Sequence, residues 1–171
     1  MPAYAEALSA LSSGGPVARD DVRRWIDSGD LLTWSVVYAL AESGPERIHP
    51  AISPEERAEF TRRYLLRCIE ENPSPGEHLH GGYEAAWELA AALKQWRRNG
   101  GRLAATIRGV ALDLEKIYRR GEPATQNRIQ CGMMEHAFED PAIRPYFVDW
   151  ERDEDLRDAF KMAVEWGSAH E

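Results

Sequence analysis

Two histidines and a glutamate, His78, His80 and Glu84, have the residue types and the short spacing from which a metal site could be built. Imidazole nitrogens and carboxylates bind zinc and related ions, so the group suggests a metal-dependent or small-ligand enzyme. Such a site needs three or four ligands, and folding would have to bring the last ones close. Because the loop 72–82 is polar and rich in Pro and Gly, the sequence favours a solvated loop without bound metal or cofactor; a contact with a partner is a further alternative.

A second pair with catalytic residue types is Cys131 and His136, which could form a Cys–His nucleophile. Five residues correspond to about 500° around an α-helix, so the two side chains would point about 140° apart. We therefore expect a core-edge cysteine and a surface histidine, and we predict no catalytic residue. The chain also has no phosphate-binding Gly loop and no GxSxG, HExxH or CxxC motif. The sequence leans away from an enzyme without excluding one.

Three arginines, Arg97, Arg98 and Arg102, flank the end of one predicted helix and the start of the next. Arginines beside free backbone N–H groups can hold a phosphate, and with the neighbouring Trp96 they could bind single-stranded nucleic acid. The net charge of −8 argues against a polyanion. A solvated face, or pairing with acidic residues of the same chain, is the interpretation that we prefer.

Near the C-terminus, aromatic residues are followed directly by a run of acidic residues. Helix capping and the helix dipole explain some of the carboxylates, and the aromatic side chains could belong to the core. The alternative is an acidic docking surface for a basic protein partner, with the aromatic residues as anchors. The residues that we predict for partner binding are Tyr146, Trp150, Glu151, Asp153, Glu154, Asp155 and Asp158.

The charge is placed unevenly along the chain. Residues 94–120 contain eight basic and two acidic side chains, a net charge of +6, and residues 135–171 contain eleven acidic and four basic ones, a net charge of −7. A basic pair of helices thus precedes an acidic C-terminal third. This asymmetry bears on the choice of partner more than the total charge does.

Apolar residues recur with helical spacing along most of the chain, and no alternating run bounded by turns indicates a strand. The clearest case is the helix predicted over 102–120, which ends at Gly121. Its apolar residues recur at steps of four, three, four and three: Leu103, Ile107, Val110, Leu114 and Ile117. The pattern predicts an all-α fold, an irregular multi-helix bundle of seven to nine helices, with HEAT-like stacked helix pairs as an alternative.

Turn and capping signals place these helices. The sequence Asn-Gly-Gly at 99–101 separates helices predicted over 83–98 and 102–120, so these two should form an antiparallel hairpin. Ser53, Pro54 and Glu56 form a capping box that starts a helix running to Glu71. The length of 171 residues fits a single domain over 1–171, in which residues 1–16 form a weakly packed N-terminal segment.

The sequence predicts a cytoplasmic protein. Its N-terminus lacks the basic start of a signal peptide, and the longest apolar run, residues 31–41, is about half the ~20 residues needed to cross a bilayer. The two cysteines, Cys68 and Cys131, do not form the pattern of a secreted disulfide scaffold.

Two stretches, residues 83–89 (YEAAWEL) and 125–136 (TQNRIQCGMMEH), resemble segments of small, uncharacterised helical bacterial proteins, some of which are encoded beside toxins as immunity proteins. The resemblance covers at most residues 80–167 and fixes no functional residue. It implies a non-catalytic binding role.

Together these observations predict a non-catalytic, protein-binding protein, an immunity-type inhibitor that covers a basic surface of a toxin. The alternative is the helical enzyme that would use His78, His80 and Glu84. Nucleic acid and membranes are not expected partners, and the sequence leaves the oligomeric state open.

Overall fold

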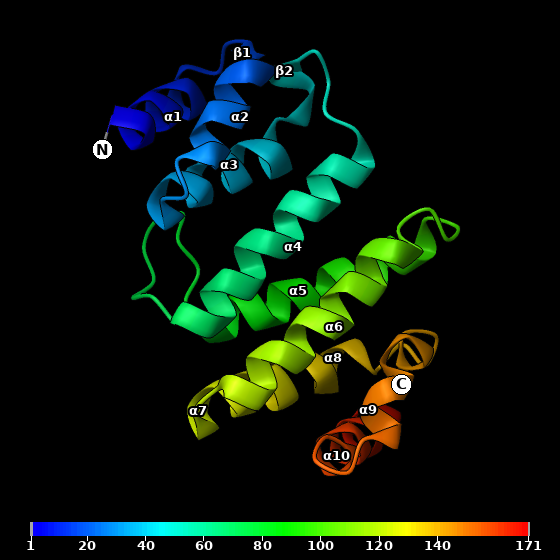
Figure 1. The fold of residues 1–171 in the computed structure, drawn as a ribbon. Helices are drawn as coiled ribbons and strands as arrows, with labels where there is room; N and C mark the ends of the chain where they lie inside the picture. The colour runs from blue at the N-terminus through cyan, green and yellow to red at the C-terminus, as the bar shows by residue number, and fades with distance from the viewer. Residues whose placement is uncertain (1, 171) are drawn as a thin grey trace. The chain divides into compact units, whose positions relative to one another are not determined.

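The computed structural model describes residues 2–170 and confirms the all-α class. Within these residues no helix is long and apolar enough to cross a membrane. The chain divides into two compact units, one made of residues up to 64 with 74–80, the other of residues 65–73 with those from 81 onward. Two compact units can belong to one domain, so the single domain over 1–171 stays a prediction. Figure 1 labels the elements.

The first unit is built around the apolar helix α3 (Leu31–Ser43), which contacts α1 (Pro2–Ser13) and α2 (Arg19–Asp27). Asp30 caps α3 by accepting a hydrogen bond from the backbone N–H of Thr33 at 2.9 Å. A parallel pair of two-residue strands, β1 (Val17–Ala18) and β2 (Ile48–His49), was not indicated by the sequence, because two residues are too short to show alternation. The 3₁₀ turn η1 (Pro45–Arg47) precedes β2.

The capping box predicted at the start of α4 (Pro54–Glu71) is confirmed. The backbone N–H of Glu56 donates to the Ser53 hydroxyl at 3.1 Å, and the backbone N–H of Ser53 donates to the Glu56 carboxylate at 2.9 Å. The second of these bonds is the largest cause of the lowered pKa of Glu56. The first part of α4 belongs to the first unit and its last turns to the second.

Arg47 connects η1 to the end of α1. Its guanidinium donates to the backbone carbonyls of Ala10 at 2.5 Å, Leu11 at 3.3 Å and Gly15 at 2.9 Å. Two of these carbonyls lie in the last turn of α1, where backbone acceptors have no helical partner and the helix dipole favours a cation. The N-terminal segment is therefore held by a charged side chain as well as by the buried Ala7.

The second unit contains the predicted hairpin, α5 (Gly82–Arg98) and α6 (Ala104–Arg120), which lie beside each other (Figure 1). The turn between them uses Gly100 and Gly101 at φ 65° and 85°, a left-handed backbone that glycine adopts without strain. The predicted apolar stripe of α6 is buried throughout.

The segment after α6 is divided into α7 (Pro123–Asn127), a π-helix η2 (Arg128–Met134) and α8 (Glu135–Ala137). The π-helix packs against α5, where a Cβ at Gly132 would lie 2.9 Å from the Cβ of Ala86. The chain then continues through η3 (Arg144–Phe147), α9 (Val148–Arg152) and α10 (Arg157–Ser168). The two stretches that carry the resemblance thus contact each other in the fold.

Arg128, at the start of the π-helix, is 5% exposed. It donates to the backbone carbonyl of Ile69 at 2.9 Å and to the hydroxyl of Thr125 at 2.8 Å. The Ile69 carbonyl lies in the last turn of α4, where a cation is favoured by the helix dipole. A Cβ at Gly82 would lie 2.6 Å from Cδ of Arg128, so glycine at this position lets α5 start beside the arginine side chain.

We predict that Arg128→Met lowers the free energy of unfolding by about 2 to 4 kcal/mol, because it leaves a buried carbonyl and a buried hydroxyl without their donor. Urea unfolding followed by circular dichroism measures this. Arg98→Met is the matched control, since Arg98 is exposed and should change the stability by less than about 0.5 kcal/mol. Equal losses in the two variants would show that the buried guanidinium has no special role.

Candidate functional site

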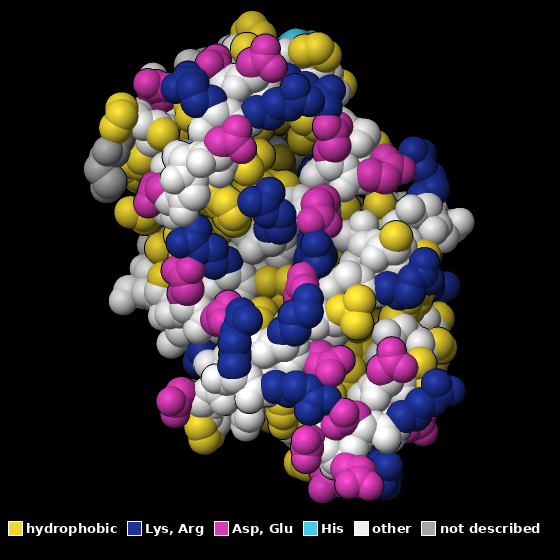
Figure 2. Space-filling view, in the orientation of Figure 1, with side chains coloured by type: hydrophobic (Ala, Val, Ile, Leu, Met, Phe, Trp, Pro, Cys, Tyr) yellow, Lys and Arg dark blue, Asp and Glu magenta, His cyan; other side chains and the backbone are white. Residues whose placement is uncertain are grey.

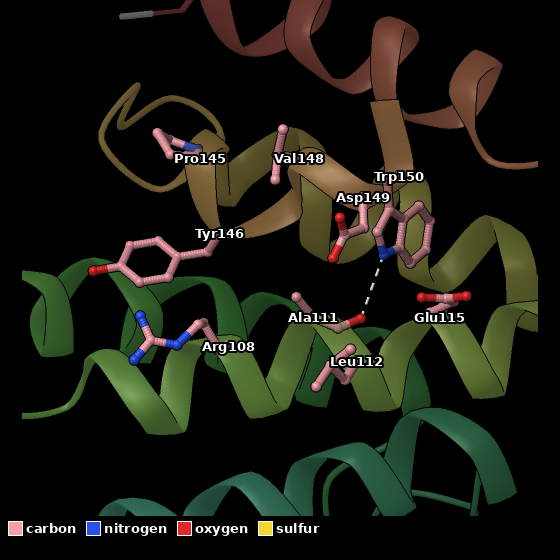
Figure 3. Close-up of a pocket in the computed structure, with 9 residues that line it drawn as sticks. All are labelled: Arg108, Ala111, Leu112, Glu115, Pro145, Tyr146, Val148, Asp149 and Trp150. Carbon is pink, nitrogen blue, oxygen red and sulfur yellow. Dashed lines mark hydrogen bonds between the residues drawn. The ribbon is translucent and has the colours of Figure 1, made fainter. Parts of the chain in front are cut away.

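A pocket of about 430 Å³ lies between α6 and the segment formed by η3 and α9 (Figure 3). This volume falls within the range of about 300 to 1,000 Å³ that is usual for binding pockets. Its walls are mainly apolar, and charged side chains stand at its rim. The lining residues are Arg108, Ala111, Leu112, Glu115, Pro145, Tyr146, Val148, Asp149 and Trp150.

Trp150 holds the two sides of the pocket together. Its side chain is 1% exposed, and its indole N–H donates to the backbone carbonyl of Ala111 in α6 at 3.3 Å. The ring lies edge-on to Tyr118 and to Phe147, with centroid distances of 5.3 and 6.2 Å. These contacts fix α9 against α6 and so set the shape of the pocket.

Charge is distributed unequally within the pocket. Figure 3 shows Arg108 beneath the ring of Tyr146, while Glu115 lies at the end where Trp150 is found and Asp149 lies beside Trp150. Arg119 binds Glu115 at 3.0 Å, whereas within residues 2–170 neither Arg108 nor Asp149 forms an ion pair. The pocket thus offers an uncompensated cation and an uncompensated carboxylate beside apolar walls.

Leu112 adds an apolar side chain to the rim of the pocket. It is 52% exposed, although it lies on the same helix as the buried stripe. A single exposed leucine is ordinary on a protein surface, and Leu112 matters here because it extends the apolar wall of the pocket outward.

The predicted acidic residues separate into two groups. Arg119 lies 2.5 Å from Asp153 and 3.5 Å from Asp155, and its hydrogen bond is the largest cause of the lowered pKa of Asp153. These two carboxylates therefore interact within the fold. The others are exposed and form no ion pair within residues 2–170: Glu151, Glu154 and Asp158.

The two predicted aromatic anchors are placed differently. Tyr146 is half-buried and lines the pocket, so its ring is accessible there. Trp150 is in the core, and its prediction as a surface anchor is wrong. The reason is that its large ring packs against Tyr118 and Phe147, while the carbonyl of Ala111 satisfies the buried indole N–H.

Among the arginines predicted as an anion site, Arg97 is engaged by a carboxylate of the same unit. It donates to Asp140 at 3.1 and 3.4 Å, and Lys94 binds Glu139 one turn earlier at 2.7 Å. Intramolecular pairing is thus what the structure shows for Arg97, and this pairing disfavours an anion site. Arg98 and Arg102 are exposed, and Arg102 has a polar or electrostatic contact of its own.

The histidines of the polar loop are also engaged within the chain. His80 Nδ1 shares a hydrogen bond with the hydroxyl of Tyr64 at 2.9 Å, and His78 lies 3.9 Å from Glu77. Glu84 accepts from the backbone N–H of Gly81 at 2.8 Å, which caps α5. Within residues 2–170 no three His, Cys, Asp or Glu side chains are grouped as a metal site would require.

Cys131 and His136 have separate partners. The thiol of Cys131 donates to Asn127 at 3.2 Å, and burial is the largest cause of its raised pKa. His136 shares a 3.2 Å contact with Glu139. The angular argument that separated the two side chains assumed an α-helix and does not hold for the π-helix at Cys131. Within residues 2–170 no hydrogen bond joins the two side chains.

Sequence reasoning missed Arg108 and Leu112, which line the pocket from α6. Leu112 gave a usable signal, because it is a leucine outside the apolar stripe of its helix. Arg108 gave none, since an arginine on the outer face of a helix is ordinary.

Comparison of the chain with protein-family models, with curated proteins and with solved structures gives no match.

We predict that the carboxyl of Asp153 titrates below the ordinary range of aspartate, and that Arg119→Gln raises its pKa toward that range. Because the pKa is lowered in the folded state, its stabilising contribution is present above the unfolded pKa and is lost as the pH falls through the folded pKa. A carboxyl-detected NMR titration measures both values. Arg120→Gln is the control, because Arg120 binds Glu70 instead. An unchanged pKa in Arg119→Gln would contradict the assignment.

Proposed function

We propose that this protein is a non-catalytic, protein-binding protein, an immunity-type inhibitor that covers a basic surface of a toxin. The observation that carries the proposal is the apolar pocket between α6 and η3–α9, which is followed along the chain by exposed carboxylates. Apolar pockets accept the buried anchor residues of protein interfaces, and surrounding charges favour a partner of opposite charge.

The pocket supports the apolar part of such an interface. Leu112 and the half-buried Tyr146 present apolar surface at its rim, and Trp150 closes it from within. The contacts of Trp150 hold the pocket in shape before a partner arrives. A preformed pocket binds without the entropic cost of ordering its walls.

The exposed carboxylates Glu151, Glu154 and Asp158 support the electrostatic part. Arg119 pairs with Asp153 and Asp155 and with none of these three, so a basic partner would meet them without displacing an internal ion pair. Opposite charge accelerates encounter and penalises acidic partners.

Two free cysteines, Cys68 and Cys131, agree with the proposed cytoplasmic location.

No observation on residues 2–170 favours the alternative of a metal-dependent enzyme at His78, His80 and Glu84. His80 is bonded to Tyr64 and Glu84 to the backbone of Gly81, so both have structural uses. We therefore advance the binding function alone.

We predict that the triple variant Glu151→Lys, Glu154→Lys and Asp158→Lys abolishes capture of the partner that the unaltered chain retains from native lysate at low salt. The control triple reverses Asp27, Glu42 and Glu46, which are exposed in the first unit and change the net charge equally. Retained proteins are identified by mass spectrometry and then purified for affinity measurement. A partner lost equally by both triple variants would show only non-specific electrostatic attraction. A partner retained by both would show that Glu151, Glu154 and Asp158 do not form the binding surface.

We predict that Leu112→Asp weakens binding of the purified partner by about 10- to 100-fold, because it places a charge where an apolar anchor should be buried. Calorimetric titration measures the affinity. Leu32→Asp is the matched control, since Leu32 is a leucine of the first unit that is 38% exposed. Thermal unfolding should be similar in the two variants. An unaltered affinity in Leu112→Asp would remove the pocket from the interface.

A further inference from the structure

A continuous row of rings crosses three elements of the second unit, and we call it the aromatic row. Its members are in successive contact, with centroid distances of 6.3, 6.5, 4.7 and 4.0 Å. The first two rings lie on α5, the third on α8, the fourth in the last turn of α10, and the fifth two residues beyond the end of that helix. In order they are Tyr83, Trp87, His136, Trp166 and His170.

The row is assembled by the close approach of the π-helix to α5. Without a Cβ, Gly132 comes near Ala86 and the ring of Tyr83, and this contact brings the α8 histidine within reach of Trp87. Across the π-helix, the amide of Gln130 donates to the sulfur of Met162 on α10 at 3.6 Å. Tight backbone packing thus fixes the rings in place, and π-helical turns of this kind are frequent at functional sites.

Much of the row is open to solvent. Five large hydrophobic side chains are exposed among residues 2–170, and three of them belong to this surface. Tyr83 is 39% exposed, Trp87 53% and Met162 55%. Such a concentration on α5 and α10 exceeds the scattered single exposures that are normal for a protein surface.

One carboxylate contacts the row directly, since Glu139 lies 3.2 Å from Nδ1 of His136. Three more, Glu84, Glu135 and Glu165, are sequence neighbours of the rings and therefore lie on the adjacent faces of their helices. The basic side chains nearest in sequence are Lys94, which is bound to Glu139, and Lys161. Exposed aromatic faces bordered by carboxylates complement a cation that carries apolar surface, and a guanidinium meets this description best because it stacks on rings and binds carboxylates.

We propose that the aromatic row binds a protein segment that presents arginine side chains between apolar residues. The inference rests on the proposed function, since it names the chemistry of the partner. It also places a second contact beside the acidic residues, because Asp158 and Met162 lie one turn apart on α10. An arginine-bearing segment could then contact the row while other cations of the same partner meet the exposed carboxylates.

The test uses the full chain and two hexapeptides with blocked ends, in which leucine alternates with a second residue. That residue is arginine in one peptide and its neutral isostere citrulline in the other. The indole N–H signals of Trp87 and Trp166, assigned by Trp→Phe variants, report binding by NMR. We expect the arginine peptide to shift both signals and to bind at least about fivefold more tightly than the citrulline peptide. Trp87→Ala and Met162→Ala should each weaken it by about three- to tenfold.

Leu32→Ala is the matched control and should leave the peptide affinity unchanged, because Leu32 is an exposed leucine of the first unit. Equal affinity for the two peptides, no shift at Trp87, or shifts confined to Trp150 would each overturn the proposal. These outcomes are independent of the partner capture that tests the proposed function. The indole signal that shifts therefore distinguishes the two sites. Trp87 and Trp166 report binding at the aromatic row, and Trp150 reports binding at the pocket.

Discussion

A guanidinium, that of Arg128, lies inside the second unit at 5% exposure, and within residues 2–170 no carboxylate pairs with it. A buried charge of this kind is costly unless its donors are satisfied, and here they meet the negative end of α4 at Ile69 and the hydroxyl of Thr125. Because α5 begins at Gly82, directly against this side chain, Arg128 sets the position of α5 relative to the π-helix. Gly132, four residues further along the same π-helix, makes the close approach to α5 on which the aromatic row depends.

Part of the uneven charge of the sequence is paired within the second unit. Lys94 binds Glu139, and Arg97 binds Asp140, so the basic end of α5 is paired with the start of the acidic third. Burial opposes the ionised form of Glu139, but hydrogen bonds from Lys94 and His136 outweigh it and lower the pKa. Figure 2 shows the result, with acidic and basic side chains interleaved over the α6, α9 and α10 region and no large area of one sign on that face. The carboxylates left over after this pairing are those available to a partner.

Local signals in the sequence were enough for the helices but not for the orientation of single side chains. Capping at Ser53 and Asp30 was predictable because each cap depends on residues three positions away. The π-helix was not, since seven residues are too few for the apolar pattern to distinguish i+5 from i+4 hydrogen bonding. Trp150 is positioned by Ala111, and Arg97 is paired with Asp140. In each case the partner lies far away in the sequence, so the periodicity of apolar residues could not predict the contact.

The same long-range contacts explain why the pocket and the acidic segment belong together. Arg119 binds Glu115, which lines the pocket, and also Asp153, which begins the acidic segment after α9. Each exposed ion pair contributes little to stability by itself, but this guanidinium links two elements through a small network of charges. Trp150 does the same from inside through Ala111. A partner that reaches both the pocket and the carboxylates beyond it would therefore meet a surface already held in one arrangement. Binding would then carry no entropic cost for ordering that surface.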